Sequence, residues 1–567
     1  MEESRQGGTV DHPQQDYTHY NFDEEYDLDR VPYWFFGAGH TAPGYPHKPL
    51  YEWTWVNHCN RGFRYAADKL SLPYSLGLDF RSYFGYELIR CGLPSEKVKK
   101  ERSSTFREGI SPMIENFDEL YNQSNEELMG YYRELKVFDV ENASWFELEL
   151  LLERLMDLDK RMWEIHMYFN CGLGAVYCLF EDLCRELLDI DDKHPLFLKL
   201  LAGFHNKGIE VDRKMFVLSQ RIKELGLVDL FSGRETASEL FPKVETSENG
   251  RQWLKEFNAF LWEDGWRSNL FFEYETSWIE DPTPAIITMR QFLKYDTFRP
   301  DELRPKLEAE RKQAEEEILS RVQPDQRAWF KTLMNVAQKF SFENEDHQYY
   351  NESYCFALTR YLLLKVAARM VAVGTLDEAE DIFFLVPEEI HKGLADPETY
   401  RLQHNVNSHK RQWEANKKIV PPPFFGTVSI EEAGRLLFEG KEPLLTKVSI
   451  GEFVVPRPEL KADLLGLCGC SGVAEGTARV VMAPEYLDAV QPGDILVAPS
   501  TSGPWTAVFS LLKGVVIDRG GTLSHAAIVG REYGIPVVAN VMEGTTKIKS
   551  GQRIKVDGNV GAVYILD

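Results

Sequence analysis

The side chain best suited to chemistry is the imidazole of His525, in the segment GGTLSHAAIVGREYGIPVV. A β-branched run ends at Arg519, and the glycine pair 520–521 allows a tight turn and a close backbone approach. The apolar residues after His525 predict a short helix that ends at Gly534. A histidine at a helix N-terminus faces unpaired N–H groups, which favour anions and disfavour the imidazolium. We therefore expect a neutral, nucleophilic imidazole near about pH 7, suited to accepting a phosphoryl group.

Several neighbours of this histidine are able to contact a phosphoryl group. Thr522 and Ser524 carry hydroxyls that bind phosphoryl oxygens or, alternatively, cap the helix. Arg531 lies one to two turns further on and either binds the phosphate or pairs with Glu532 and solvent. We predict that Thr522, Ser524 and Arg531, together with the backbone of Gly521, form the phosphate-contacting set.

The texture of the chain changes near Gly466. Beyond it, short β-branched runs such as TARVVMA, DILVAPS and GVVIDRG alternate with turns, which predicts a compact α/β domain over residues 467–567. Upstream, apolar residues three and four apart predict a large, mostly α-helical domain over residues 31–449, with few strand signals. We expect a linker or hinge over residues 450–466 and a flexible acidic arm over residues 1–30. The predicted fold class is thus multidomain.

Composition narrows the function further. The net charge of -25 lies almost entirely before Gly466, and an acidic surface argues against a nucleic-acid partner. No signal peptide or apolar run of membrane-spanning length is recognisable, so we expect a soluble, cytoplasmic protein with no membrane partner. The eight cysteines are scattered, and no set of cysteines and histidines has zinc-ligand spacing. The sequence therefore predicts no metal site.

The segment around His525 resembles the phosphohistidine segment of the PEP-utilising enzymes, as in PEP synthase, pyruvate phosphate dikinase and rifampicin phosphotransferase. The preceding run GDILVAPSTSGPW, which contains Thr501 and Trp505, resembles the same domain. The resemblance implies that residues 467–567 form a swivelling phosphohistidine domain. It also implies that His525 is the phosphoryl carrier.

The helical part carries weaker resemblances. The segment GWRSNLFFEYETSWIEDPTPAI is similar to part of the substrate domain of rifampicin phosphotransferase. The segments ENEDHQYYNESY and GTLDEAEDIFFLVPEEI are similar to phenylphosphate synthase-type subunits. The resemblance implies that this domain binds the substrate. It places the chain closest to phenylphosphate synthase and the alkylphenol (p-cresol) phosphate synthase.

Two parts of related enzymes are not recognisable. No TIM barrel follows His525, and no Gly-rich phosphate loop or strand-rich nucleotide domain precedes Gly466. The resemblance to phenylphosphate synthase then implies that a separate ATP-grasp subunit, similar to the N-terminal part of PEP synthase, binds ATP and Mg²⁺. We expect that subunit to phosphorylate His525, and we expect this chain itself to bind no cofactor tightly.

A hydroxyl acceptor needs a base, because a phenol has a pKa of about 10. In the helical domain, His347 follows Glu345 and Asp346, and a carboxylate that orients an imidazole would make an acid–base pair. The alternative is a surface histidine in a polar loop. We predict catalytic roles for His347 and Glu345, and the Glu-x-His-x-x-Tyr resemblance adds Tyr350 as a substrate contact.

Four other residues are candidates for substrate binding. His166 and Trp163 lie on an aromatic helix that either walls a site for an aromatic ligand or is plain core. His40 lies where the family has a His-x-Pro-x-Pro segment, with the spacing stretched here. Arg267 belongs to the segment that resembles the rifampicin phosphotransferase substrate domain, although a structural role remains open.

Together these features predict an enzyme of phenol degradation, and so of aromatic catabolism. It would be the subunit of an ATP-dependent, dikinase-type phosphotransferase that moves a phosphoryl group from His525 to a phenolic hydroxyl. One alternative keeps the mechanism and changes the acceptor to an antibiotic or another bulky alcohol. Another is a non-enzymatic phosphocarrier that passes its phosphoryl group to a second protein.

Overall fold

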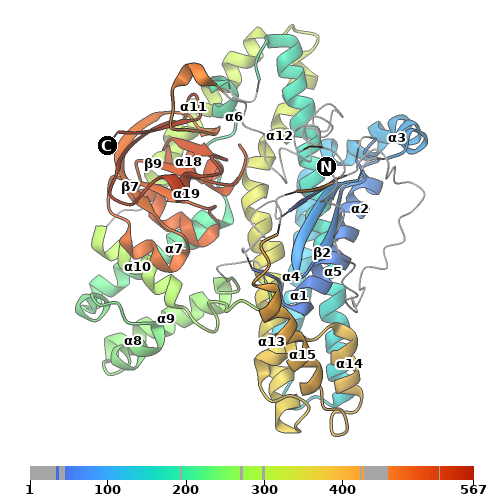
Figure 1. Ribbon diagram of the computed structural model, residues 1–567. Coiled ribbons are helices and arrows are strands. Elements are labelled where there is room, and N and C mark those ends of the chain that lie inside the picture. The colour runs from blue at the N-terminus through green and yellow to red at the C-terminus, as the bar shows by residue number, and fades with distance from the viewer. Residues whose placement is uncertain are drawn as a thin grey trace, which may run out of the picture.

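The computed structural model describes residues 33–36, 45–421, 424–426, 429 and 457–566, except for short gaps at residues 74, 93, 192–193, 269–271, 296–299 and 523. It consists of a large helical domain and a C-terminal α/β domain packed against it (Figure 1). The predicted fold class is confirmed. The predicted arm over residues 1–30, His40 and residues 450–456 of the predicted linker lie outside the described residues.

The helical domain is built around one long helix, α5 (Trp145–Leu188). It begins with a capping box, in which the side chains of Ser144 and Glu147 each accept a hydrogen bond from the backbone N–H of the other residue. Its apolar face packs against α2 (Asn60–Lys69) and α12 (Arg327–His347). Figure 1 shows α12 running through the middle of the molecule, with the C-terminal domain on one side of it and α2 and α5 on the other.

The remaining helices surround this centre. They are α1 (Pro49–Thr54), α3 (Glu96–Glu115), α4 (Phe117–Lys136), α6 (Pro195–Leu200), α7 (Lys207–Glu224), α8 (Ala237–Val244), α9 (Glu248–Asp264), α10 (Thr283–Tyr295), α11 (Pro300–Arg321), α13 (Tyr354–Ala372), α14 (Pro387–Ala395) and α15 (Gln403–Asn416). Two π-helical segments interrupt the α-helices: η2 (Trp55–Cys59) between α1 and α2, and η4 (Gln348–Ser353) between α12 and α13. The π-helix is rare, and short π segments occur frequently at functional sites.

The helical domain also contains an antiparallel sheet that the sequence analysis did not predict. Its order is β2-β3-β1-β4, with strands at Leu78–Tyr83, Tyr86–Cys91, Tyr33–Phe36 and Phe424–Gly426. A two-residue turn joins β2 to β3, and both of its residues, Phe84 and Gly85, have positive φ angles of 56° and 80°. Strands β1 and β4 come from opposite ends of the domain, so their pairing closes the domain on itself.

The C-terminal domain has an eight-stranded mixed sheet in the order β5-β12-β11-β7-β8-β9-β10-β6. The strands are β5 (Leu464–Leu465), β6 (Leu467–Cys470), β7 (Val473–Val480), β8 (Asp494–Ala498), β9 (Gly514–Ile517), β10 (Val537–Ala539), β11 (Arg553–Asp557) and β12 (Ala562–Ile565). β7, β8, β9 and β10 run parallel, and apolar clusters cover both faces. β5 corrects the predicted boundary: its main-chain pairing with β12 places it in this sheet, although the linker was expected to reach residue 466.

One short helix lies where the two domains meet. α18 (His525–Tyr533) packs on β6 and β10 and also contacts α11 and α12 of the helical domain. Its apolar residues, among them Ala526 and Val529, belong to the C-terminal core. The fold therefore places His525, the first residue of α18, at the boundary between the domains.

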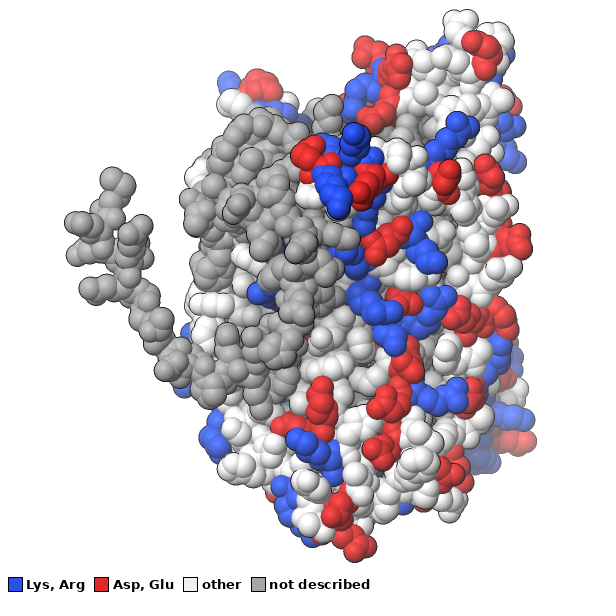
Figure 2. Space-filling model, turned by 90° about the vertical axis from the view of Figure 1, so that its right-hand side faces the viewer, with Lys and Arg blue, Asp and Glu red and all other residues white. Residues whose placement is uncertain are grey.

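Acidic and basic side chains of the described residues alternate over the surface seen in Figure 2 and form no large patch of one sign. Figure 2 shows the side of the molecule that carries α2 and α3, on which acidic and basic side chains are interspersed. Many acidic and basic side chains among the described residues form ion pairs, such as Arg154 with Glu134 and Arg161 with Glu127. Within the described part of the chain, no helix combines the length and the apolarity that crossing a membrane requires.

Candidate active site

Two residues just before α18, Thr522 and Ser524, carry hydroxyl groups at the N-terminal end of the helix. Gly520 has a φ angle of 123°, and a Cβ atom there would lie 2.8 Å from the Cβ of Ser524, so the turn requires glycine. Ser524 is the N-cap residue but makes no side-chain capping bond. Among the described residues, the hydroxyls of Thr522 and Ser524 are buried and have no hydrogen-bond partner. The capping role considered for Ser524 is thus not realised, and both residues directly precede the N-terminus of α18, the end of a helix that favours anions.

His525 is 4% exposed and held by two threonines. Its Nδ1 lies 2.8 Å from Thr501 Oγ1, and its Nε2 lies 3.2 Å from Thr506 Oγ1. When Nδ1 carries the proton it donates to Thr501, which leaves the lone pair of Nε2 for a phosphoryl group. The sequence analysis gave neither threonine a role.

The helical domain contributes a carboxylate to the same point. Glu345, on α12, has its Oε2 3.6 Å from Nε2 of His525. Burial raises the pKa of Glu345 well above its usual value; repulsion by Asp346 adds to this, and the nearby Arg531 opposes it. The structure therefore brings the predicted catalytic glutamate to the predicted phosphoryl carrier. A carboxyl group of raised pKa is suited to taking up a proton during a reaction.

Arg531 and Glu532 hold the loop and the domain contact. Nη1 of Arg531 donates to the carbonyls of Gly469 and Thr522, at 2.8 and 2.9 Å. Its Nε and Nη2 have no hydrogen-bond partner among the described residues, so they remain able to bind an anion. Glu532 does not pair with Arg531 through a hydrogen bond; instead it accepts from the backbone N–H groups of the adjacent residues 203–204 in the helical domain, at 2.9 and 3.3 Å.

A pocket opens beside His525, between the two domains. The helical domain provides Arg267, Glu345, Tyr349, Asn206, Gly208, Gln348 and Ser353, and the C-terminal domain provides Gly503, Thr506 and Val529. Its volume of about 20 Å³ is room for one or two water molecules. The guanidinium of Arg267 lies 4.7 Å from the centre of the Trp278 ring. A Cβ on Gly503 would lie 2.2 Å from Nη2 of Arg267, so this glycine lets the cation approach the loop.

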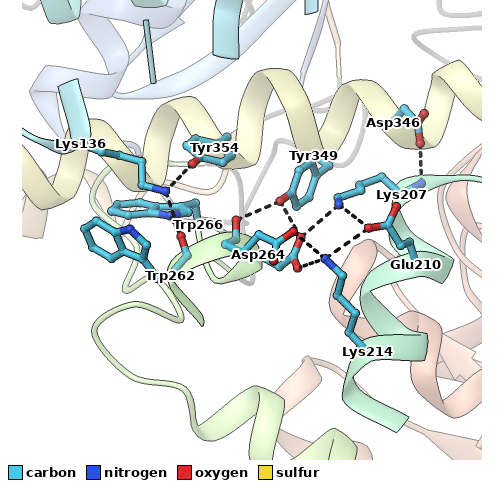
Figure 3. A network of polar contacts seen from close by, with 11 residues as sticks. Lys136, Lys207, Glu210, Lys214, Trp262, Asp264, Trp266, Asp346, Tyr349 and Tyr354 are labelled. Carbon is cyan, nitrogen blue, oxygen red and sulfur yellow. Dashed lines mark hydrogen bonds and ion pairs between the residues drawn. The ribbon is translucent and has the colours of Figure 1, made fainter. Parts of the chain in front are cut away.

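A network of ions fixes the wall of this pocket (Figure 3). The hydroxyl of Tyr349 donates to Asp264 at 2.9 Å, and Asp264 is fully buried. Asp264 in turn accepts from Lys214 at 2.6 Å and pairs with Lys207 at 3.2 Å. The backbone N–H of Lys207 donates to Asp346 at 2.6 Å. The network joins α7, α9 and α12, which together position Tyr349.

Other predicted site residues lie elsewhere. His347 is not among the residues that line the pocket; its Nδ1 lies 3.1 Å from the carbonyl of Glu343, and its ring lies 4.4 Å from that of His166. Trp163 stacks on His166 inside the helical core, at 5.1 Å. Tyr350 also lies outside the pocket lining, and its carbonyl accepts from the hydroxyl of Tyr132. Residues two apart on a helix point to different sides, and the structure places Glu345 beside His525 and His347 beside His166.

Two family models match the chain. Residues 164–345 match the rifampicin phosphotransferase fourth domain. Residues 490–561 match the mobile domain of the PEP-utilising enzymes, and this match contains His525 together with Thr501 and Thr506.

Curated relatives agree with these matches. The chain is 27% identical to an uncharacterized phosphotransferase, YvkC, of Bacillus subtilis, over 83% of this chain and 54% of the relative. It is 32% identical to rifampicin phosphotransferase of the same species, over 51% of this chain and 32% of the relative. It is also 29% identical to chondramide synthase of Chondromyces crocatus, over 76% of this chain and 11% of the relative.

The chain thus spans about half the length, or less, of these relatives. The matched regions include both the helical domain and the domain that carries His525. These matches relate the chain to the PEP-utilising enzymes and to rifampicin phosphotransferase.

Proposed function

We propose that His525 carries a phosphoryl group and passes it to the hydroxyl of a small phenolic substrate, such as phenol or p-cresol, to give an aryl phosphate. One observation carries the proposal: Nε2 of His525 faces the helical domain, 3.6 Å from the carboxylate of Glu345 and beside a pocket. The choice of a phenol rests on the resemblance of the segment 343–354 to phenylphosphate synthase-type subunits.

The transfer step follows from the groups around Nε2. The bond between Nε2 and phosphorus breaks while the acceptor oxygen forms its bond to phosphorus. The proton of the acceptor hydroxyl passes to Glu345, and the imidazole regains its lone pair. Arg267 and the remaining N–H groups of Arg531 supply positive charge for the phosphoryl oxygens, and the hydroxyls of Thr522 and Ser524 supply hydrogen bonds.

Loading, the phosphorylation of His525, requires a different arrangement. We propose that a separate ATP-grasp subunit binds ATP and Mg²⁺ in the cytoplasm. It would transfer one phosphoryl group of ATP to Nε2 and another to a water molecule, so that AMP and phosphate are released. His525 is 4% exposed against the helical domain, so the C-terminal domain must swing away before such a subunit reaches it. We expect the hinge in the predicted linker, residues 450–466.

Two alternatives keep His525 as the carrier. A bulky alcohol or antibiotic acceptor is supported by the relatives named rifampicin phosphotransferase and by the match to that enzyme's fourth domain. A phosphocarrier that serves a second protein is less well supported, because a carrier does not need a helical domain that covers its histidine.

Loading is tested with the full chain, an ATP-grasp partner and ATP labelled at the β or γ phosphate. We expect acid-labile, base-stable label on the wild-type chain and none on His525→Ala. The matched control is His391→Ala, which removes a partly exposed histidine on α14. Equal label on wild type and His525→Ala would contradict the carrier role.

Discharge of the label identifies the acceptor. Phenol or p-cresol added to the loaded chain should convert the label into an aryl phosphate. Conversion by rifampicin or another large alcohol, but by no phenol, would favour the first alternative. Release only to a second protein would favour the phosphocarrier.

A further inference from the structure

A second buried polar cluster lies behind the pocket wall. It consists of His166 on α5, His347 at the end of α12 and Glu352 in the π-helical segment η4. All three are at most 5% exposed, and their candidate ligand atoms lie within 4.8 Å of one another. Nδ1 of His166 is 3.7 Å from Oε1 of Glu352. None of the three lines the pocket beside His525.

The carboxylate of Glu352 is unusual for a buried group. Its Oε2 has no hydrogen-bond partner among the described residues, although the side chain is only 2% exposed. Oε2 of Glu343, one helical turn before His347, is buried in the same way and also has no such partner. A buried acceptor without a partner is destabilising, so its retention beside two imidazoles points to a ligand that repays this cost.

The local backbone brings these groups to one side. Glu352 follows His347 by five residues, and in a regular α-helix residues five apart lie about 140° apart around the axis. η4 widens the turn to hydrogen bonds five residues apart, so both side chains face α5. On α5, the stacking of Trp163 at 5.1 Å and 16° fixes the plane of the His166 ring.

We propose that His166, His347 and Glu352 bind a divalent first-row transition-metal ion, such as Zn²⁺, Mn²⁺ or Fe²⁺. Two imidazole nitrogens and one carboxylate oxygen are a donor set that such ions favour. With bonds of about 2.1 Å, two atoms that share an ion are at most about 4.2 Å apart. The pair at 3.7 Å already meets this limit, and the upper bound of 4.8 Å for the group requires side-chain shifts below about 1 Å.

The site has a consequence for the neighbouring pocket. Gln348, Tyr349 and Ser353 line the pocket, and all three lie in η4, which follows His347 directly and contains Glu352. An ion that joins this segment to α5 holds the pocket wall in place. The proposal does not depend on the chemistry of His525, since it concerns the helical domain alone.

Metal binding is tested on the full chain after treatment with a chelator. Titration with Co²⁺ should produce visible absorption bands that saturate at one ion per chain, and Zn²⁺ should displace them. Glu352→Gln keeps the shape of the side chain and removes the charge; it should weaken binding by at least about tenfold. His391→Gln, which alters a partly exposed histidine paired with Glu153, should bind as the wild type does.

A second measurement guards against misfolding of the variant. Zn²⁺ should raise the Tm of the wild type and of His391→Gln, and leave the Tm of Glu352→Gln unchanged. Without metal, Glu352→Gln should be at least as stable as the wild type, because it no longer buries a carboxyl group with an unpartnered oxygen. Absence of stoichiometric Co²⁺ binding, or equal binding by Glu352→Gln, would overturn the proposal.

Discussion

The substitution Glu345→Gln tests the transfer step most directly. Glutamine keeps the size of the side chain and loses the ability to accept a proton from the acceptor hydroxyl. General-base catalysis by a positioned side chain contributes about 10² to 10⁴ in rate. In the closed arrangement Oε2 lies 3.6 Å from Nε2 of His525, slightly longer than a hydrogen bond, so we take the lower end of this range. We expect discharge to slow about 100-fold, which corresponds to about 2.7 kcal/mol in the barrier.

The assay is a single turnover. The chain is first loaded with labelled phosphoryl group and separated from nucleotide, and the acceptor is then added in a rapid-quench instrument. The wild-type discharge rate should rise with pH as Glu345 loses its proton, over a range above the usual pKa of a glutamate, because burial raises the pKa of Glu345. Glu345→Gln should lose this dependence while it loads at the normal rate.

The matched control is Glu316→Gln, which changes an exposed glutamate on α11. It should load and discharge like the wild type. A Glu345→Gln chain that discharges at the wild-type rate, with an unchanged pH profile, would refute the role of Glu345 as the base.

Three further outcomes are expected. Gly503→Ala should push the Arg267 guanidinium from its place and slow discharge by several-fold without affecting loading; a defect in loading alone would contradict the contact described. Arg531→Lys should lower the yield of loading, because lysine cannot hold the carbonyls of Gly469 and Thr522 and bind phosphate at the same time. Normal loading would show that the several N–H groups of the guanidinium are not needed here. Glu273 is buried with no hydrogen-bond partner for either oxygen among the described residues, and burial raises its pKa from 4.5 to about 8. The folded state therefore binds more protons than the unfolded state over this range, so the free energy of unfolding falls as the pH rises from about 4.5 to about 8. Glu273→Gln should then raise the free energy of unfolding at pH 9 by at most about 5 kcal/mol relative to the wild type, measured as a higher Tm, and should give no gain at pH 5. A gain of equal size at both pH values would point to another cause.

The sequence predicted those features of the C-terminal domain that depend on neighbouring residues. The glycine pair, the helix that starts at His525 and its end at Gly534 all appear in the structure, because turns and caps are decided by neighbouring residues. The alternation of strands and turns in the C-terminal domain is of the same kind. The domain resemblance then supplied the role of the histidine, which local pattern alone does not.

The parts that could not be predicted depend on distant contacts. β1 and β4 are four and three residues long and lie almost 400 residues apart in sequence, so neither carries a strong pattern of its own. Glu345 and His347 look like a pair in the sequence, yet α12 places Glu345 beside His525 and His347 in the helical core. The contact of Thr506 with His525 depends on the 3₁₀ helix Gly503–Leu511 before β9, which carries no sequence signal for holding an imidazole.

One contact of α18 sets the order of events. Glu532 accepts hydrogen bonds from two backbone N–H groups of the helical domain. It lies seven residues after His525 on the same nine-residue helix. A helix this short moves as a rigid rod, so the histidine cannot turn toward a nucleotide while Glu532 stays attached. In the proposed cycle, this contact of Glu532 therefore separates loading from transfer in time. His525 cannot reach the nucleotide and the acceptor in the same arrangement of the domains.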